Sequence, residues 1–260
     1  TKYAANNITN LSMVPKRPEL DDKTASLLDG KKYNTNVIIH EGAQVQNYAF
    51  GGGLGDSKVE RSGDVYGNTY IALLGGTVRK DIYAGGTAGG LDNLFGAENF
   101  TATANAYIQG GMCRNVYGGG YEGHVGHHPG DITTGISDDR LAKANVVIGK
   151  VNGTSWTDGI PAINRNVYGG GEGGSVYGSS HVTLNNGMIG YRYMNTGTES
   201  EPVYKYVEEL DDKEEGDNQL ETSGNIFGGG YVVNRYVDET NINMYGGTVR
   251  GSLFGGGEIS

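Results

Sequence analysis

Hydrophobic residues along this chain recur in short runs that are separated by glycines. In the clearest case Ile242 and Met244 alternate with polar residues, and a glycine pair at 246–247 follows. Val249 and Leu253 then lie in two further short apolar runs. Alternation with a period of two predicts strands, and the glycine pair predicts a turn. The same pattern recurs in the stretches 37–42, 69–83, 104–111, 145–149 and 182–189.

An aliphatic residue, an aromatic residue and a glycine-rich triplet form a second recurring pattern. Its copies lie at residues 49–53, 82–86, 116–120, 167–171, 226–230 and 253–257. Such a repeat indicates a stack of similar units rather than one round core. Strands this short cannot bury a face alone, so each is expected to pair in parallel with its counterpart one repeat away. The sequence therefore predicts an all-β fold, a parallel β-solenoid.

The spacing between copies defines the basic unit of the stack. From Gly228 to Gly255 is 27 residues, which is enough for three short strands and their turns. A unit with three faces favours a right-handed β-helix of about six coils, because right-handed crossovers strongly predominate between parallel strands. A two-layered solenoid is the alternative.

Two intervals between copies are much longer than the basic unit. Gly118 to Gly169 is 51 residues, and Gly169 to Gly228 is 59 residues. These excesses predict loop insertions near 127–164 and 191–222. Insertions in repeat proteins leave the stack as loops and often carry function.

Residues 1–35 lack the repeat. A short helical pattern at 18–30 makes this segment either a cap for the first coil or an unstructured leader. The repeat domain covers 36–260, and it is expected to continue beyond residue 260 because a bare solenoid end exposes unpaired strands.

Composition removes several classes of function. The net charge is −10 and the sequence pI is near 4.9, so nucleic acid is not expected as a partner. No apolar run is long enough to span a membrane. The single cysteine, Cys113, excludes an intrachain disulfide. The chain has 18 tyrosines against 5 phenylalanines and 1 tryptophan, a usage that suits rings packed with their hydroxyl groups near water.

One aromatic residue per repeat predicts a ladder of rings about 4.8 Å apart, the spacing of neighbouring strands. Glycines that follow the aromatic residue would let the turns approach. Two roles remain open for the ladder: a structural stack, or a strip that binds sugars, whose rings pack on aromatic faces. The binding candidates are Tyr83, Tyr117, Tyr168 and Trp156, and the structural candidates are Phe50, Phe227, Phe254, Gly118, Gly169, Gly228 and Gly255.

The local histidine cluster contains His124, His127 and His128. Their spacing could hold a metal ion on a loop, but no second cluster or cysteine pair accompanies them, so surface histidines on a turn are the alternative. The acidic stretch 199–217 lacks the carboxylate offsets of a Ca²⁺ loop and is interpreted as a solvated segment. No cofactor is therefore predicted, with a divalent cation as the alternative.

Catalytic signatures are absent from the sequence. There is no G-x-S-x-G motif, and the glycine triplets lack the following Lys-Ser/Thr of a phosphate-binding loop. The local group closest to the acidic and basic residues of polysaccharide lyases is Asp138, Asp139 and Arg140. The prediction is that the chain is not an enzyme, and these three residues are the candidates if it is.

The run 166–176 (NVYGGGEGGSV) and the strand at 182–184 resemble the glycine-rich β-helix repeats of large surface proteins from gut Bacteroidetes and Firmicutes. The resemblance covers residues 36–260 apart from the two insertions. It implies an adhesin or surface fibre, extracellular or on the bacterial cell surface, whose partners are glycans or surface proteins of the host or of bacteria. A polysaccharide lyase or hydrolase and a filament subunit that associates end to end are the alternatives.

Overall fold

The described part of the chain consists of β-strands and their connections. The computed structural model describes residues 35–55, 63, 65, 68–87, 103–126, 142–150, 160–208, 223–232 and 236–258, and no helix lies in these ranges. Apart from Thr35, the segment 1–35 for which a cap or leader was predicted lies outside the described residues.

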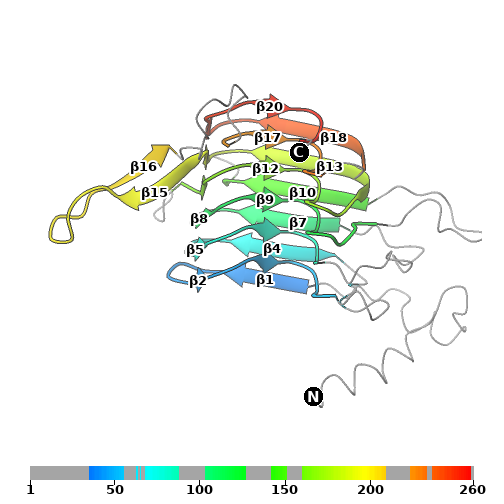
Figure 1. Ribbon diagram of the computed structural model, residues 1–260, viewed down its shortest axis with the longest axis horizontal. Coiled ribbons are helices and arrows are strands. Elements are labelled where there is room, and N and C mark those ends of the chain that lie inside the picture. The colour runs from blue at the N-terminus through cyan, green and yellow to red at the C-terminus, as the bar shows by residue number, and fades with distance from the viewer. Residues whose placement is uncertain are drawn as a thin grey trace, which may run out of the picture.

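Three parallel sheets of six strands make up the body of the molecule (Figure 1). Sheet A, with the longest strands, contains in spatial order β1 (Thr35–Ile39), β4 (Thr69–Leu73), β7 (Thr103–Ile108), β10 (Ala142–Ile148), β13 (Val176–Leu184) and β18 (Val237–Met244). Sheet B contains β2 (Gln44–Val45), β5 (Thr77–Val78), β8 (Met112–Cys113), β11 (Ala162–Ile163), β14 (Met188–Ile189) and β19 (Thr248–Val249). Sheet C contains β3 (Ala49–Phe50), β6 (Ile82–Tyr83), β9 (Val116–Tyr117), β12 (Val167–Tyr168), β17 (Ile226–Phe227) and β20 (Leu253–Phe254).

Each repeat of the sequence adds one strand to each sheet, in the chain order A, B, C. Equivalent residues of successive repeats lie in register, as where Val37 of β1 pairs with Ile71 of β4. The predicted all-β architecture with parallel pairing from repeat to repeat is confirmed, and it is consistent with a β-solenoid.

The hydrophobic core receives side chains from all three sheets. Ile71 of β4, Val78 of β5 and Ile82 of β6 belong to one cluster, and each is at most 1% exposed. In β4 the residues alternate between buried and half-buried positions, which is why the sequence alternates with a period of two. Each repeat therefore places a few aliphatic side chains inside and relies on its neighbours to cover them.

At several turns, glycines allow neighbouring repeats to approach to the spacing of paired strands, where a larger side chain would force them apart. A Cβ added at Gly119 would lie 2.7 Å from the backbone nitrogen of Gly171 in the next repeat. At the turn between sheets A and B, Gly111 has a φ of 73°, which favours glycine.

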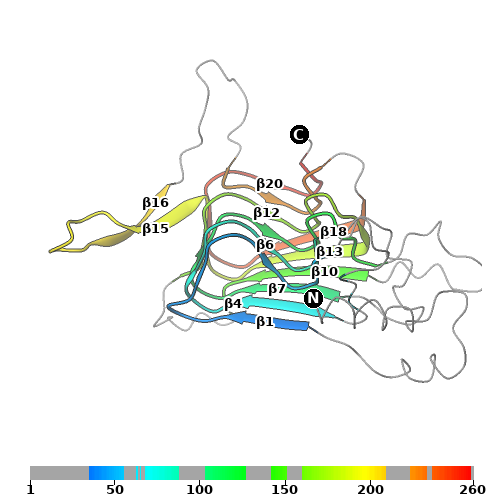
Figure 2. The ribbon, with the colours of Figure 1, turned by 60° about the horizontal axis from the view of Figure 1, so that its bottom comes forward.

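A two-stranded antiparallel hairpin leaves the body after β14. It consists of β15 (Tyr191–Asn195) and β16 (Tyr204–Glu208), and it projects away from the sheets in both views (Figures 1 and 2). The hairpin occupies the first half of the insertion expected at 191–222. The insertion expected near 127–164 is not one continuous loop. Strand β10 of sheet A and strand β11 of sheet B lie within it and belong to the regular repeat.

Candidate functional site

The aromatic residues of sheet C stack into one continuous ladder. Successive rings have centroid separations from 4.6 to 5.1 Å and interplanar angles from 4 to 11°. Their in-register strands set this spacing, because neighbouring strands lie about 4.8 Å apart. The six rings, from the first repeat to the last, are Phe50, Tyr83, Tyr117, Tyr168, Phe227 and Phe254.

Sugar binding by this ladder would require exposed ring faces, and its tyrosines are buried. Tyr83, Tyr117 and Tyr168 are 0%, 3% and 2% exposed. A sugar ring needs an open aromatic face, and these faces are covered by neighbouring rings. The three tyrosines therefore form a structural stack and not an exposed aromatic strip.

The chain that follows each glycine triplet covers the ladder. Tyr121 packs its ring edge on Tyr83 at 5.8 Å, and Tyr231 packs in the same way on Tyr168 at 5.7 Å. Carboxylates also occupy this layer: the Tyr83 hydroxyl donates to Glu172, and the Tyr168 hydroxyl donates to Oε2 of Glu258 at 2.6 Å. Tyr83 and Tyr168 are thus each covered by a tyrosine one repeat later and a glutamate two repeats later.

An amide ladder runs beside the aromatic one, at the residue before β9, β12 and β17 of sheet C. The backbone N–H of Asn166 donates to Oδ1 of Asn115 at 2.8 Å, and the N–H of Asn225 donates to Oδ1 of Asn166 at 2.9 Å. Ser252 continues the series by donating to Asn225 at 2.8 Å. These bonds satisfy backbone donors that the corner between two sheets would otherwise leave unpaired.

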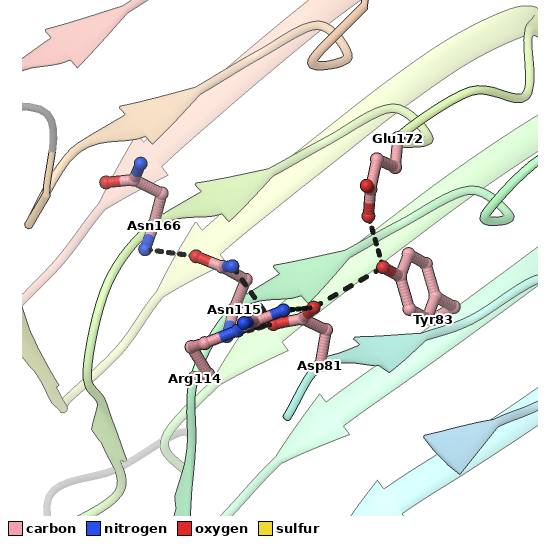
Figure 3. Close-up of polar contacts among 6 residues, drawn as sticks. All are labelled: Asp81, Tyr83, Arg114, Asn115, Asn166 and Glu172. Carbon is pink, nitrogen blue, oxygen red and sulfur yellow. Dashed lines mark hydrogen bonds and ion pairs between the residues drawn. The ribbon is translucent and has the colours of Figure 1, made fainter. Parts of the chain in front are cut away.

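Asp81 occupies the same position in the second repeat and converts the ladder into a charged cluster (Figure 3). Its Oδ1 accepts from Nε of Arg114 at 2.8 Å and from the backbone and side-chain nitrogens of Asn115, both at 3.0 Å. Its Oδ2 accepts from the Arg114 guanidinium, and the Tyr83 hydroxyl lies 3.5 Å away. The Asp81 side chain is 1% exposed and that of Arg114 is 36% exposed.

Burial changes the acid–base properties of the groups around Asp81. Burial raises the pKa of Tyr83, and its hydrogen bond to Glu172 and the Asp81 charge raise it further. Burial also raises the pKa of Glu172, opposed by the Tyr83 hydrogen bond and reinforced by Asp81. The hydrogen bond to Asp81 raises the pKa of Arg114, which therefore keeps its charge. Burial raises the pKa of Cys113, so its thiol stays protonated.

This cluster is built to hold charge and not to transfer protons. The oxygens of Asp81 are occupied by four donors from Arg114 and Asn115, so the carboxylate has little capacity to act as a general base. The guanidinium faces partly outward, so its charge is available at the surface while its partner is not.

Sequence reasoning missed the Asp81–Arg114 pair. A signal was present, since Asp81 stands where later repeats have Asn115, Asn166 and Asn225. A charged residue at a position of buried amides needs a counter-ion.

The hairpin concentrates tyrosines on one of its faces. The register pairs Tyr193 with Tyr206 and Asn195 with Tyr204, and alternation brings Tyr191 to the same side. The Tyr193 ring lies 5.6 Å from that of Tyr204 and 4.9 Å from that of Tyr206. Tyr193 is 45% exposed and Tyr204 is 58% exposed. Sequence reasoning missed this tyrosine face, although tyrosines alternate with other residues on both sides of 196–203.

The Tyr206 side chain connects the hairpin face to the body. The Tyr206 hydroxyl accepts from the backbone N–H of Ile160 at 2.9 Å and donates to its carbonyl at 2.7 Å. These two hydrogen bonds orient the hairpin relative to sheet B.

The remaining predicted residues do not assemble into a site among those described. Nδ1 of His124 accepts from the backbone N–H of Ser175 at 2.9 Å, and its ring packs on Tyr177. No three His, Cys, Asp or Glu side chains converge as metal ligands within the described ranges. The other candidates, His127, His128, Asp138, Asp139, Arg140 and Trp156, lie outside the described residues.

Comparisons with family models, curated proteins and solved structures return no match, so the functional argument depends on the chain's own residues. In the ranges that the structure describes, no helix has the length and apolar character needed to cross a bilayer.

Proposed function

We propose that this chain is a structural and adhesive module of a large extracellular bacterial surface protein. In this proposal the three sheets wind as a right-handed β-helix of about six coils, which acts as a stiff stalk. The hairpin β15–β16 is the contact arm, and its partner is a glycan of a host or bacterial surface.

The observation that carries the proposal is the contrast between the two sets of tyrosines. On the ladder Tyr83 and Tyr168 are buried, whereas on the hairpin Tyr193 and Tyr204 are 45% and 58% exposed. A two-stranded hairpin is marginally stable alone, so it gains little from keeping aromatic rings in water. Tyrosine combines a flat apolar face with a polar hydroxyl, and it is common in binding surfaces for that reason.

Orientation of the arm supports the same proposal. The two hydrogen bonds between Tyr206 and Ile160 limit the freedom of the hairpin relative to the body. A pre-ordered surface loses less conformational entropy when it binds. The exposed rings are therefore presented in one arrangement rather than on a free loop.

Glycan-array binding, followed by titration of the best ligand, tests the arm. The variant Tyr193→Ser/Tyr204→Ser should lose roughly tenfold or more in affinity, because each ring contributes on the order of 1 kcal/mol. The matched control is Tyr236→Ser/Tyr245→Ser, which removes two tyrosines that are 58% and 75% exposed outside the hairpin. The control should bind as the unmodified chain does.

Three outcomes would contradict the adhesive proposal. Equal loss in the two double variants would remove the hairpin from the binding site. Release of unsaturated uronic products from polysaccharides would favour the lyase alternative. Filaments in negative-stain microscopy, without any glycan binding, would favour the self-assembling subunit.

A further inference from the structure

A column of cations follows the corner between sheets B and C. The backbone N–H of Arg114 donates to the carbonyl of Lys80 at 3.0 Å, and the N–H of Arg165 donates to the carbonyl of Arg114 at 2.8 Å. Lys80, Arg114 and Arg165 therefore occupy neighbouring positions in three successive repeats. Arg79, next to Lys80, is exposed. We call these four residues the basic strip.

Stacking like charges in this way is unfavourable by itself. Equivalent positions in neighbouring strands lie about 4.8 Å apart. Cations in such register repel one another, and water only partly screens them. The backbone-bonded neighbours at the two ends of the column, Asn47 and Gly224, are uncharged.

The two carboxylates described near the strip compensate only part of its charge. Asp81 is bound to Arg114 from the interior, and Glu172 is turned toward the Tyr83 hydroxyl (Figure 3). Arg114 makes the one ion pair found among the described residues. Among the described residues, the four cations of the strip outnumber these two carboxylates, on a chain whose net charge is −10. The strip is thus a local positive surface on an acidic protein.

An aromatic face adjoins the strip. Nζ of Lys80 lies 4.7 Å from the centre of the Tyr48 ring, and Tyr48 is 38% exposed. This ring differs from the buried ladder rings because part of it reaches solvent. Cations beside a partly exposed aromatic ring provide groups for a ligand that carries both anions and flat apolar surfaces.

We propose that the basic strip and Tyr48 bind a linear carboxylated polysaccharide that runs along the stacking direction of the repeats. Carboxylates of the ligand would meet Arg79 and Lys80 in one repeat and Arg165 two repeats later, and one sugar face would pack on Tyr48. Guanidinium groups match the planar carboxylate geometry. The extended row of cations suits a repeating ligand better than a single small anion.

Nucleic acid is the less favoured polyanion. A strip of four cations offers few contacts to a phosphate backbone, whose binding depends on neutralising many charges. The polysaccharide site lies on the body and does not use the hairpin tyrosines. Its test is therefore independent of the test of the contact arm.

Titration of the full chain with polygalacturonate tests the proposal. The variant Arg79→Gln/Lys80→Gln/Arg165→Gln should reduce affinity by about tenfold or more, from the loss of three charge contacts of modest strength. Arg114 is left in place because its loss would strand Asp81. Tyr48→Ser should reduce affinity about threefold through the loss of one partly exposed ring. Circular dichroism should show unchanged sheet content.

The matched control removes two cations elsewhere on the body, as Lys143→Gln/Lys150→Gln, and has the same net charge as the strip variant Lys80→Gln/Arg165→Gln. It should bind polygalacturonate within about twofold of the unmodified chain, since screening limits distant charges. Equal losses in the two double variants would overturn the strip. The proposal would also fail if single-stranded DNA bound as tightly as polygalacturonate. It would fail as well if heparin bound at the strip and polygalacturonate did not. Binding of neutral dextran with the same affinity would remove the role of charge.

Discussion

The Asp81–Arg114 pair allows a double-mutant cycle with opposite expectations for its two partners. Arg114→Gln removes the guanidinium and leaves a carboxylate that is 1% exposed. Asp81→Asn instead restores the amide found at this position in later repeats, where Asn115 and Asn166 each accept a backbone N–H. The freed Arg114 side chain is 36% exposed and can turn to water.

The expected magnitudes follow from this asymmetry. Removing one partner of a buried ion pair costs about 3–5 kcal/mol. The lower end, about 3 kcal/mol, applies to Arg114→Gln because Asn115 still donates twice to Asp81, at 3.0 Å each. Asp81→Asn should cost about 1 kcal/mol, the value of one net hydrogen bond. In the double variant no charge is buried, so the total should stay near 1 kcal/mol and the coupling should be about 2–3 kcal/mol.

Urea unfolding followed by far-ultraviolet circular dichroism measures the four free energies of unfolding in the cycle. The unmodified chain and the three variants should share a common m-value, which keeps the comparison on stability alone. Equal destabilisation by the two single variants would refute the reasoning, because it would mean that Asp81 needs Arg114 no more than Arg114 needs Asp81. Additive effects in the double variant would refute it as well.

Two further predictions concern the close approach of repeats and the covering carboxylates. Gly119→Ala should cost about 1–3 kcal/mol by overpacking, because the new Cβ would lie 2.7 Å from the nitrogen of Gly171. The control is Gly256→Ala, at the equivalent position of the repeat at 253–257, where an added Cβ meets no atom within 4 Å. It should leave the urea midpoint nearly unchanged, and similar midpoints for the two variants would contradict this account. Burial raises the pKa of Glu172 in the folded protein. Its contribution to the free energy of unfolding is therefore fully present below the unfolded pKa of about 4.3, and it is lost as pH rises through the pKa of the folded state. Glu172→Gln should therefore flatten the decline of the urea midpoint as pH rises above about 4.3, and an unchanged pH slope would count against it.

Much of the architecture could be predicted because the repeat is written locally in the chain. The alternation around Ile71 and the glycines around Gly111 each specify a strand or a turn within a few residues. Parallel stacking then follows, since no single repeat can bury its own aliphatic side chains. The order of strand, turn and aromatic residue was therefore enough to predict parallel sheets.

Burial of the ladder could not be predicted in the same way, because the covering groups come from distant parts of the chain. Tyr83 meets Glu172, 89 residues later, only after two further repeats have stacked. The same holds for Arg114, whose partner Asp81 lies 33 residues earlier. Sequence periodicity says that equivalent residues align, but it does not say which side chains cover them.

The hairpin illustrates the same limit. The stretch 191–208 departs from the repeat, so the sequence marks it only as an insertion. Its antiparallel register, which brings Tyr193, Tyr204 and Tyr206 to one face, depends on how the intervening loop folds. The chain by itself determined a stack of parallel repeats, because each repeat encodes its own strands and turns. Only the tertiary structure decided which tyrosines are buried and which reach solvent, because that depends on contacts between repeats and on the pairing of an insertion with itself.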